Sequence, residues 1–215
     1  MKVLLLPLAL LALSGALVEA SGQQPGAVEG TLSLRLGAPR KWATRYPGGG
    51  ATAAAVQPVP AVVYLEGELP APGGASAAVS ISQEGERFVP GAVGVSTGAT
   101  VRFPNADPFY HNVFSYSGPR FDLGRYPPGE SREIVFDEPG IVRVYCEIHE
   151  FMRAVVVVTD HGFHAVVEED GTFRIPAVPP GSYTLVAFHP DGGTLQTSVS
   201  VTAGGTARVA LELGE

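Results

Sequence analysis

The stretch that decides the fold is residues 142–158, which read VRVYCEIHEFMRAVVVV. Two apolar runs of strand length flank a short polar loop. Cys146, His149 and Met152 occupy positions i, i+3 and i+6 of this loop. A loop between two strands can direct all three side chains toward one point. The stretch therefore predicts a strand, a ligand-bearing loop and a second strand.

The residue types of this loop point to copper. A thiolate, an imidazole and a thioether form a soft ligand set that suits copper in either oxidation state. A second imidazole would complete the set, and His111, 35 residues before Cys146, is the natural candidate. It follows a turn marked by Pro108 and begins a predicted strand. The four residues predict a trigonal His–His–Cys site with a long axial Met, the geometry of blue-copper electron-transfer centres.

Three other interpretations of the loop compete with copper. Zinc is disfavoured because a thioether is a poor zinc ligand. A Cys–His nucleophilic pair is disfavoured because Cys146 follows a strand and lacks a helix N-terminus or a third group to activate it. Cys146 as a small buried hydrophobic residue is the plainest alternative, and the added Met152 and His111 argue against it.

Outside the loop, the chain has the pattern of strands and turns throughout. It contains 27 glycines and 19 prolines, and 16% of its residues are charged, which argues against long amphipathic helices. Turn residues at 169–171, 179–181 and 191–193 separate short apolar segments. We therefore expect an all-β protein of sandwich or barrel type. Strands are predicted at 30–36, 61–66, 77–83, 100–103, 112–115, 132–136, 141–146, 154–159, 163–168, 171–175, 182–188, 195–201 and 206–213.

The motif Cys146-x-x-His149-x-x-Met152, followed by an apolar strand, resembles the ligand loop of the amicyanins, short-loop members of the cupredoxin family. The segment His111-Asn112-Val113 is similar to their upstream ligand segment. The resemblance covers about residues 75–159 and implies a Greek-key β-sandwich with one mononuclear type 1 copper. It implies that His111, Cys146, His149 and Met152 are the ligands, and that Asn112 helps to brace the copper loop.

The surroundings of the loop lead to two further expectations. Glu147 and Glu150 stand where amicyanin-like loops often have uncharged or proline residues. Two carboxylates near the metal would favour its oxidised state. If Pro108, Phe109 and Phe151 surround the exposed edge of His149, they would form a small apolar docking patch for transient redox partners.

A second resemblance lies toward the C-terminus. Residues 170–186, DGTFRIPAVPPGSYTLV, look like the second half of a carboxypeptidase-regulatory-like domain, a small prealbumin-type β-sandwich. Segments 30–34 and 61–67 resemble its first half. We therefore expect a signal peptide at 1–20, N-terminal strands of this sandwich at 21–74, a cupredoxin domain at 75–159 and the remaining sandwich at 160–215. A spacer or docking role is preferred over sugar binding, because no platform of stacked aromatic residues is present.

The N-terminal residues predict export to the periplasm or secretion. Lys2 precedes an apolar stretch from Val3 to Val18, and small residues occupy the −3 and −1 positions of a cleavage site after Ala20. An uncleaved N-terminal anchor is the alternative. The one cysteine, Cys146, excludes an intramolecular disulfide, a multi-cysteine zinc or iron–sulfur site, and a two-cysteine dinuclear copper centre.

Two further motifs are interpreted as structural. Residues 94–98, GVSTG, match a nucleophile-elbow pattern but continue into a strand rather than a helix, so we interpret them as a turn. His161, His164 and His189 are interpreted as scattered exposed histidines rather than as an additional metal site. The paired His-x-His motifs of multicopper oxidases are absent from the sequence.

These observations predict a non-catalytic protein that carries single electrons. The net charge is −7 without a basic cluster, which argues against nucleic acid and favours a basic redox partner such as a c-type cytochrome or an oxidoreductase. No integral membrane span is expected in the mature chain. Two alternatives remain: a periplasmic carrier whose copper is cargo, and a cell-envelope scaffold with an incidental copper site.

Overall fold

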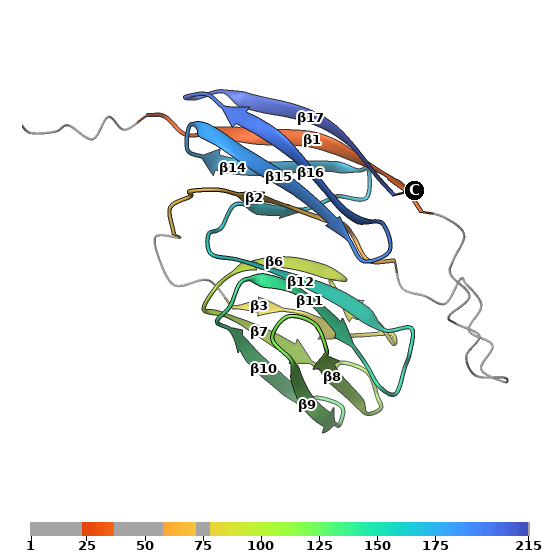
Figure 1. The fold of residues 1–215 in the computed structure, drawn as a ribbon. Coiled ribbons are helices and arrows are strands. Elements are labelled where there is room, and N and C mark those ends of the chain that lie inside the picture. The colour runs from red at the N-terminus through yellow and green to blue at the C-terminus, as the bar shows by residue number, and fades with distance from the viewer. Residues whose placement is uncertain (1–22, 37–57, 72–77, 215) are drawn as a thin grey trace, which may run out of the picture.

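The computed structural model describes residues 23–36, 58–71 and 78–214, and across them the chain is all-β, as predicted. Its strands form two β-sandwiches that pack against each other (Figure 1). We call residues 79–159 the inserted sandwich, and residues 26–66 together with 164–214 the flanking sandwich. The first interrupts the second along the chain, and both of its ends connect to the same neighbour.

The inserted sandwich has two main sheets over an apolar core. Its strands are β3 (Val79–Ser80), β4 (Ser82–Gln83), β5 (Phe88–Val89), β6 (Ala92–Ser96), β7 (Ala99–Pro104), β8 (His111–Ser115), β9 (Phe121–Tyr126), β10 (Ser131–Phe136), β11 (Gly140–Tyr145) and β12 (Arg153–Thr159). One sheet has the order β10-β7-β3 and the other β6-β12-β11-β8-β9, while β4 pairs with β5. Phe88, Phe103, Tyr126 and Phe136 are the largest side chains in the core between them.

The flanking sandwich combines two N-terminal strands with five C-terminal ones. Its strands are β1 (Gly26–Arg35), β2 (Val62–Glu66), β13 (His164–Val166), β14 (Thr172–Val178), β15 (Gly181–His189), β16 (Gly193–Val201) and β17 (Thr206–Gly214). The sheets are β14-β1-β17 and β13-β2-β15-β16. β1 lies between β14, with which it is antiparallel, and β17, with which it is parallel from Ala27 opposite Thr206 to Arg35 opposite Gly214. The N-terminal strands are therefore integral to both sheets.

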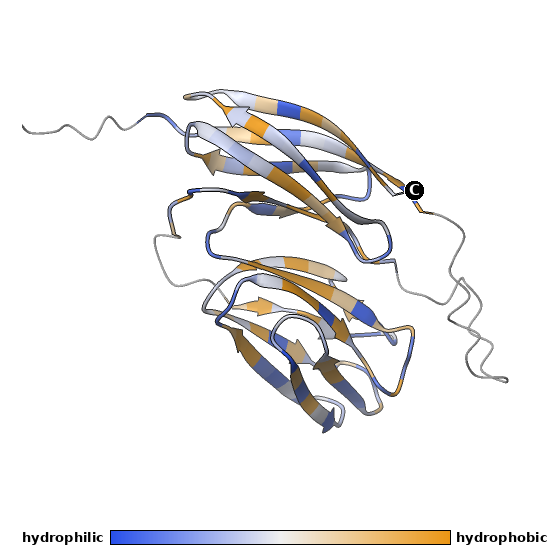
Figure 2. Ribbon diagram, viewed as in Figure 1, coloured by the Kyte–Doolittle hydropathy of each residue, from blue (hydrophilic) through white to orange (hydrophobic). Residues whose placement is uncertain are grey.

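A third apolar cluster joins the two sandwiches. Val155 and Val157 of β12 pack there with Val62 of β2 and Phe188 of β15. The alternate residues of β12, at positions 154, 156 and 158, belong to the core of the inserted sandwich. β12 is therefore buried on both faces, which explains why it is hydrophobic over almost its whole length (Figure 2).

Three observed strands were absent from the sequence prediction. β6 overlaps the segment interpreted as a turn, and in the structure only Thr97 and Gly98 form the turn, after the strand has ended at Ser96. β9 carries Asp122, Gly124 and Arg125 because it is a sheet edge, which weakened its apolar signal. β5 is only two residues long. The expected signal peptide at 1–20 lies outside the described residues.

The interpretation of His161, His164 and His189 as exposed is wrong. His161 and His189 are buried, and His164 is partly buried against Gly94, where a Cβ would overlap its ring. The His161 ring accepts the backbone N–H of Phe163, and His189 accepts those of Asp191 and Gly192. Burial lowers the pKa of all three, which favours neutral rings, as the acceptor roles of His161 and His189 require.

Across the described ranges, no helix has the length and hydrophobicity needed to cross a bilayer.

Candidate metal centre

Two strands bring the predicted ligands to one end of a sheet. His111 is the first residue of β8, and Cys146 directly follows the last residue of β11. β8 and β11 are antiparallel neighbours, with Tyr145 opposite Phe114. The start of one strand and the end of its antiparallel neighbour meet at the same sheet edge. The loop 146–152 therefore begins beside His111 and returns as β12.

The structure places three of the four predicted ligands in one group: His111, Cys146 and His149. The Cys146 Sγ lies 3.7 Å from the His111 Nδ1 and 3.9 Å from the His149 Nδ1, and the two nitrogens are 3.1 Å apart. Metal bonds of about 2.0 Å to nitrogen and 2.3 Å to sulfur place trigonal donors roughly 3.5 to 3.8 Å apart. The donor types and the two sulfur–nitrogen distances therefore fit a first-row transition metal, while the nitrogen–nitrogen distance is shorter than this range.

The fourth predicted ligand, Met152, lies in the same apolar cluster as Cys146 and is fully buried. Its backbone N–H donates to the carbonyl of His149 at 2.9 Å, which closes the ligand loop into a turn. The thioether is thus held in the core of the inserted sandwich, in the loop that also carries Cys146 and His149.

Asn112 ties the ligand loop to β8. Its side chain is buried, and its Oδ1 accepts the backbone N–H of Glu147 at 2.6 Å. This hydrogen bond joins the residue after His111 to the residue after Cys146. It fixes the separation of the two segments that supply the ligands, which is the bracing role that the resemblance implied.

Asp107 is a site residue that sequence reasoning missed. Its Oδ2 lies 2.9 Å from the His111 Nε2, and its carboxylate also accepts the backbone N–H groups of Gly85 and Glu86 at 2.6 and 2.9 Å. Burial alone raises the pKa of Asp107, but the hydrogen bonds from Glu86, His111 and Gly85 together outweigh it and lower that pKa below its usual value. An ionised carboxylate only accepts, so the proton of His111 resides on Nε2 and leaves Nδ1 free to bind a metal.

Asn105 orders the segment that carries Asp107 and His111. The Asn105 Nδ2 donates to the carbonyl of Phe109 at 2.8 Å, and its Oδ1 accepts the backbone N–H of Asp107 at 3.1 Å. Asn105 is buried at the end of β7 and forms a bridge with Gln83. A polar residue two positions before an Asp-Pro turn was the available signal for this role.

Aromatic rings surround the exposed side of His149. Its ring centroid is 5.6 Å from that of Phe109 and 5.9 Å from that of Phe151. Phe109 is 36% exposed and Phe151 is partly buried, while Pro108 is exposed beside Phe109 in the chain. Burial lowers the pKa of His149, and the adjacent His111 lowers it further. Phe109 and Phe151 thus lie beside the His149 ring, and a docking role for Pro108, Phe109 and Phe151 stays a prediction.

The two carboxylates expected to add charge near the metal differ in their surroundings. Glu147 forms an exposed ion pair with Arg125, whose Nη2 lies 3.0 Å from the carboxylate. Glu150 is exposed in the same loop. Arg125 partly cancels the charge of Glu147, so its influence on the metal is smaller than the sequence suggested.

Comparison with known proteins gives different results for the two sandwiches. The carboxypeptidase regulatory-like domain matches residues 151–214, which confirms the predicted resemblance of the C-terminal part. This match begins before β12, a strand that the structure places in the inserted sandwich. No curated protein matches the chain.

Solved structures similar to part of this chain include a nitrite reductase, a cupredoxin and an amicyanin. A copper-containing nitrite reductase from Thermus scotoductus SA-01 is 28% identical over 38% of this chain, with a TM-score of 0.37, and this chain covers 22% of that enzyme. A purple cupredoxin from Nitrosopumilus maritimus is 23% identical over 38% of this chain and 99% of its own, with a TM-score of 0.35. A reduced mutant form of amicyanin is 26% identical over 38% of this chain and 81% of its own, with a TM-score of 0.35.

Proposed function

We propose that this protein is an exported type 1 copper protein that carries single electrons between redox partners. The observation that carries the proposal is the convergence of the His111 Nδ1, the Cys146 Sγ and the His149 Nδ1 at separations of 3.1 to 3.9 Å. A thiolate with two imidazoles is the trigonal donor set of blue-copper sites, and the buried thioether of Met152 supplies their weak axial donor type. Copper bound there would supply a one-electron couple between Cu(II) and Cu(I).

The residues around the ligands support electron transfer by limiting rearrangement. Asp107 holds the proton of His111 on Nε2, and the amides of Gly85 and Glu86 hold Asp107. Asn112 fixes the beginning of the ligand loop. Cys146 and His111 are buried away from water. A site whose ligands are already positioned reorganises little between two charge states.

His149 is the proposed point of electron entry and exit. It is the ligand with an exposed edge, and Phe109 and Phe151 flank its ring. A small apolar surface around an exposed ligand suits a short-lived contact with a partner. The net charge of −7 favours a basic partner, such as a c-type cytochrome or an oxidoreductase, with an association rate that falls as salt rises. A protein that supplies every ligand leaves no position for a substrate, which favours a carrier over an enzyme.

The test is a titration of the purified protein with Cu(II), followed by visible absorption and EPR. We expect one equivalent of copper, an intense blue colour and narrow copper hyperfine splitting. All three should disappear in Cys146→Ser, whose hydroxyl cannot replace the thiolate. Glu150→Gln is the matched control in the same loop, and it should keep the spectrum because its side chain is exposed.

Voltammetry separates the electron carrier from the two alternatives. A reversible one-electron wave with slow loss of copper to a chelator supports the proposal. A colourless protein, or a copper signal indifferent to Cys146→Ser, contradicts it. Rapid transfer of copper to the chelator without a reversible wave would instead identify a copper carrier, while the absence of tight copper binding would indicate a scaffold.

A further inference from the structure

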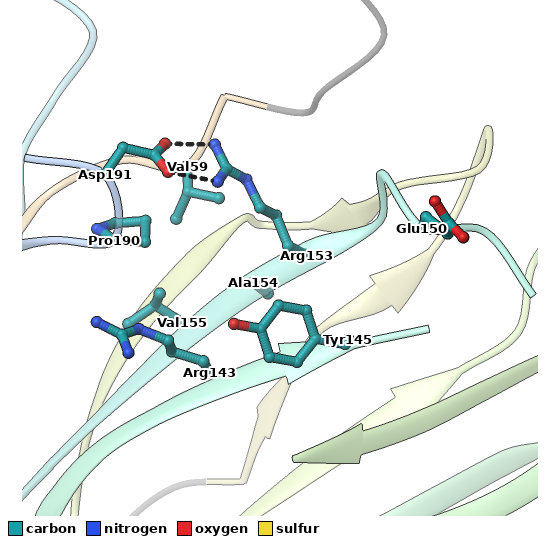
Figure 3. Close-up of a pocket in the computed structure, with 9 residues that line it drawn as sticks. All are labelled: Val59, Arg143, Tyr145, Glu150, Arg153, Ala154, Val155, Pro190 and Asp191. Carbon is teal, nitrogen blue, oxygen red and sulfur yellow. Dashed lines mark hydrogen bonds and ion pairs between the residues drawn. The ribbon is translucent and has the colours of Figure 1, made fainter. Parts of the chain in front are cut away.

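A cleft of about 290 Å³ lies where the two sandwiches meet, outside the metal centre. Arg143, Tyr145 and Arg153 line it from the inserted sandwich, and Pro190 and Asp191 line it from the flanking sandwich (Figure 3). Val59 completes its apolar wall together with Ala154 and Val155. The cleft therefore combines two guanidinium groups and a phenol with a small apolar surface.

The strand register explains why these polar side chains share one face. Arg143 of β11 lies opposite Val155 of β12, and Tyr145 lies opposite Arg153. Residues two apart on a strand point to the same side of the sheet. All four therefore point away from the core of the inserted sandwich, and Val155 is part of the apolar junction. The cleft is the polar continuation of that junction.

The two arginines differ in their partners. Arg153 forms a two-point ion pair with Asp191, with N–O distances of 2.7 and 2.5 Å. Arg143 makes no ion pair within the described residues, and its Nε is buried without a hydrogen-bond partner. Its guanidinium lies over the Phe188 ring, 5.5 Å from the centroid. Asp191 is thus engaged by Arg153, while Arg143 acts on Asp191 only through the longer-range attraction of its charge and keeps its Nε–H without a hydrogen-bond partner.

The geometry of the Arg143 guanidinium selects the type of ligand. The Nε–H and one Nη–H of a guanidinium point in parallel along one edge, which matches the two oxygens of a carboxylate. A buried N–H without a partner costs free energy until an acceptor binds it. The neighbouring wall of Val59, Val155 and Pro190 accommodates a short hydrocarbon chain. Glu150, at the far end of the cleft in Figure 3, disfavours a second negative charge there.

We propose that this cleft binds a small monocarboxylate, with its carboxylate on the Nε edge of Arg143 and its short apolar chain toward Val59 and Pro190. The hydroxyl of Tyr145 lies on the same strand and face, two residues from Arg143, and can donate to the same anion. None of the residues that would contact the anion is a proposed metal ligand, so binding to this cleft can be tested in the metal-free protein.

The experiment is an NMR titration of the isotopically labelled, metal-free protein with sodium butyrate at constant ionic strength. We expect saturable shifts of the Arg143 Nε–H and of amides near Val59 and Pro190, with a Kd of about 1 mM or below, which is within reach of a six-atom ligand. Arg143→Gln should weaken binding at least about tenfold, because it removes the charge and the paired donors. Arg143→Lys keeps the charge but loses the planar fork, and should weaken binding several-fold.

Two controls keep the result specific. Arg120→Gln removes an exposed arginine outside the cleft and should leave the affinity unchanged. Sodium phosphate, titrated in place of butyrate, should bind at least about tenfold more weakly, because the cleft has an apolar wall and one unpaired guanidinium. Shifts that fail to saturate by about 50 mM, equal shifts in Arg143→Gln, or equal affinity for phosphate would each overturn the proposal.

Discussion

The two sandwiches share an architecture but differ in what they bury. Each has two sheets around an apolar cluster. In the described residues, buried polar side chains are concentrated in the inserted sandwich: Gln83, Ser96, Asn105, Asp107, His111, Asn112, Ser115 and Thr159. The interior of the flanking sandwich is the apolar cluster alone. The buried His161 lies between β12 and β13, and the buried His189 is the last residue of β15, and neither belongs to that cluster.

This difference links function mainly to the inserted sandwich and stability mainly to the flanking sandwich. Burying a polar group is unfavourable unless it is hydrogen-bonded. Asp107 meets this condition with three N–H donors, and these hydrogen bonds hold the surrounding segments in place. In the inserted sandwich, they fix the geometry of the metal ligands. The flanking sandwich has long strands and an apolar interior, which suits a supporting module. We therefore expect mutations in the two regions to change different observables.

The largest effect should come from Leu185→Ala in the flanking core. Leu185 is fully buried, and its truncation leaves a cavity that lowers the free energy of unfolding by about 2 to 5 kcal/mol. Urea denaturation followed by circular dichroism measures this loss. Below the transition, the copper spectrum should match that of the unmodified protein. Exposed Ser198→Ala on β16 is the matched control and should change stability by less than about 0.5 kcal/mol.

A second substitution, Asp107→Asn, tests the buried polar groups of the inserted sandwich. The amide cannot accept three N–H donors as the carboxylate does, and it no longer holds the proton of His111 on Nε2 by charge. Copper affinity should fall about 10- to 100-fold, measured by competition with a chelator. Asp122→Asn is the control, because Asp122 is an exposed residue whose carboxylate accepts only the nearby amide of Gly124. An unchanged affinity in Asp107→Asn would remove Asp107 from the site.

The smallest effect should come from the ion pair that links the sandwiches. The hydrogen bond with Arg153 lowers the pKa of Asp191, so the pair stabilises the fold above about pH 4 and this contribution disappears as the pH falls through the lowered pKa. Since Asp191 is partly exposed, Asp191→Asn should cost only about 0.5 to 1 kcal/mol at pH 7 and less near pH 2. Denaturation at both pH values tests this, and Glu133→Gln in the fully surface pair with Arg102 is the control. An equal loss at pH 2 and pH 7 would contradict the electrostatic origin.

The sequence predicted the fold class and the residues of the ligand group because both depend on local patterns. Cys146 and His149 are three residues apart, and His111 directly precedes a recognisable strand. The role of Asp107 was not predictable, because its other partners are backbone amides of residues 85 and 86, in a separate turn. No side-chain pattern reveals which amide groups a fold brings together.

The apolar contact between the two sandwiches was also not predicted from the sequence, and the reason is physical. The continuous apolar run of β12 was visible in the sequence, and it implied burial on both faces. The residues that cover the second face of β12 belong to β2 and β15, two strands that are far from β12 in the chain. The same separation hid the cleft, since Arg143 and Asp191 meet only when the sandwiches pack.

The parallel pairing of β1 with β17 also constrains the order of folding. β1 cannot complete its sheet until β17, almost the whole chain later, has been synthesised. Residues 78–159 contain all the strands of the inserted sandwich, so that part can fold while its neighbour waits for the last strand. Contacts of such sequence separation slow folding, and an unpaired β1 would meanwhile expose its edges. We therefore expect the half of the molecule that carries the candidate metal centre to reach its final shape before the half that supports it.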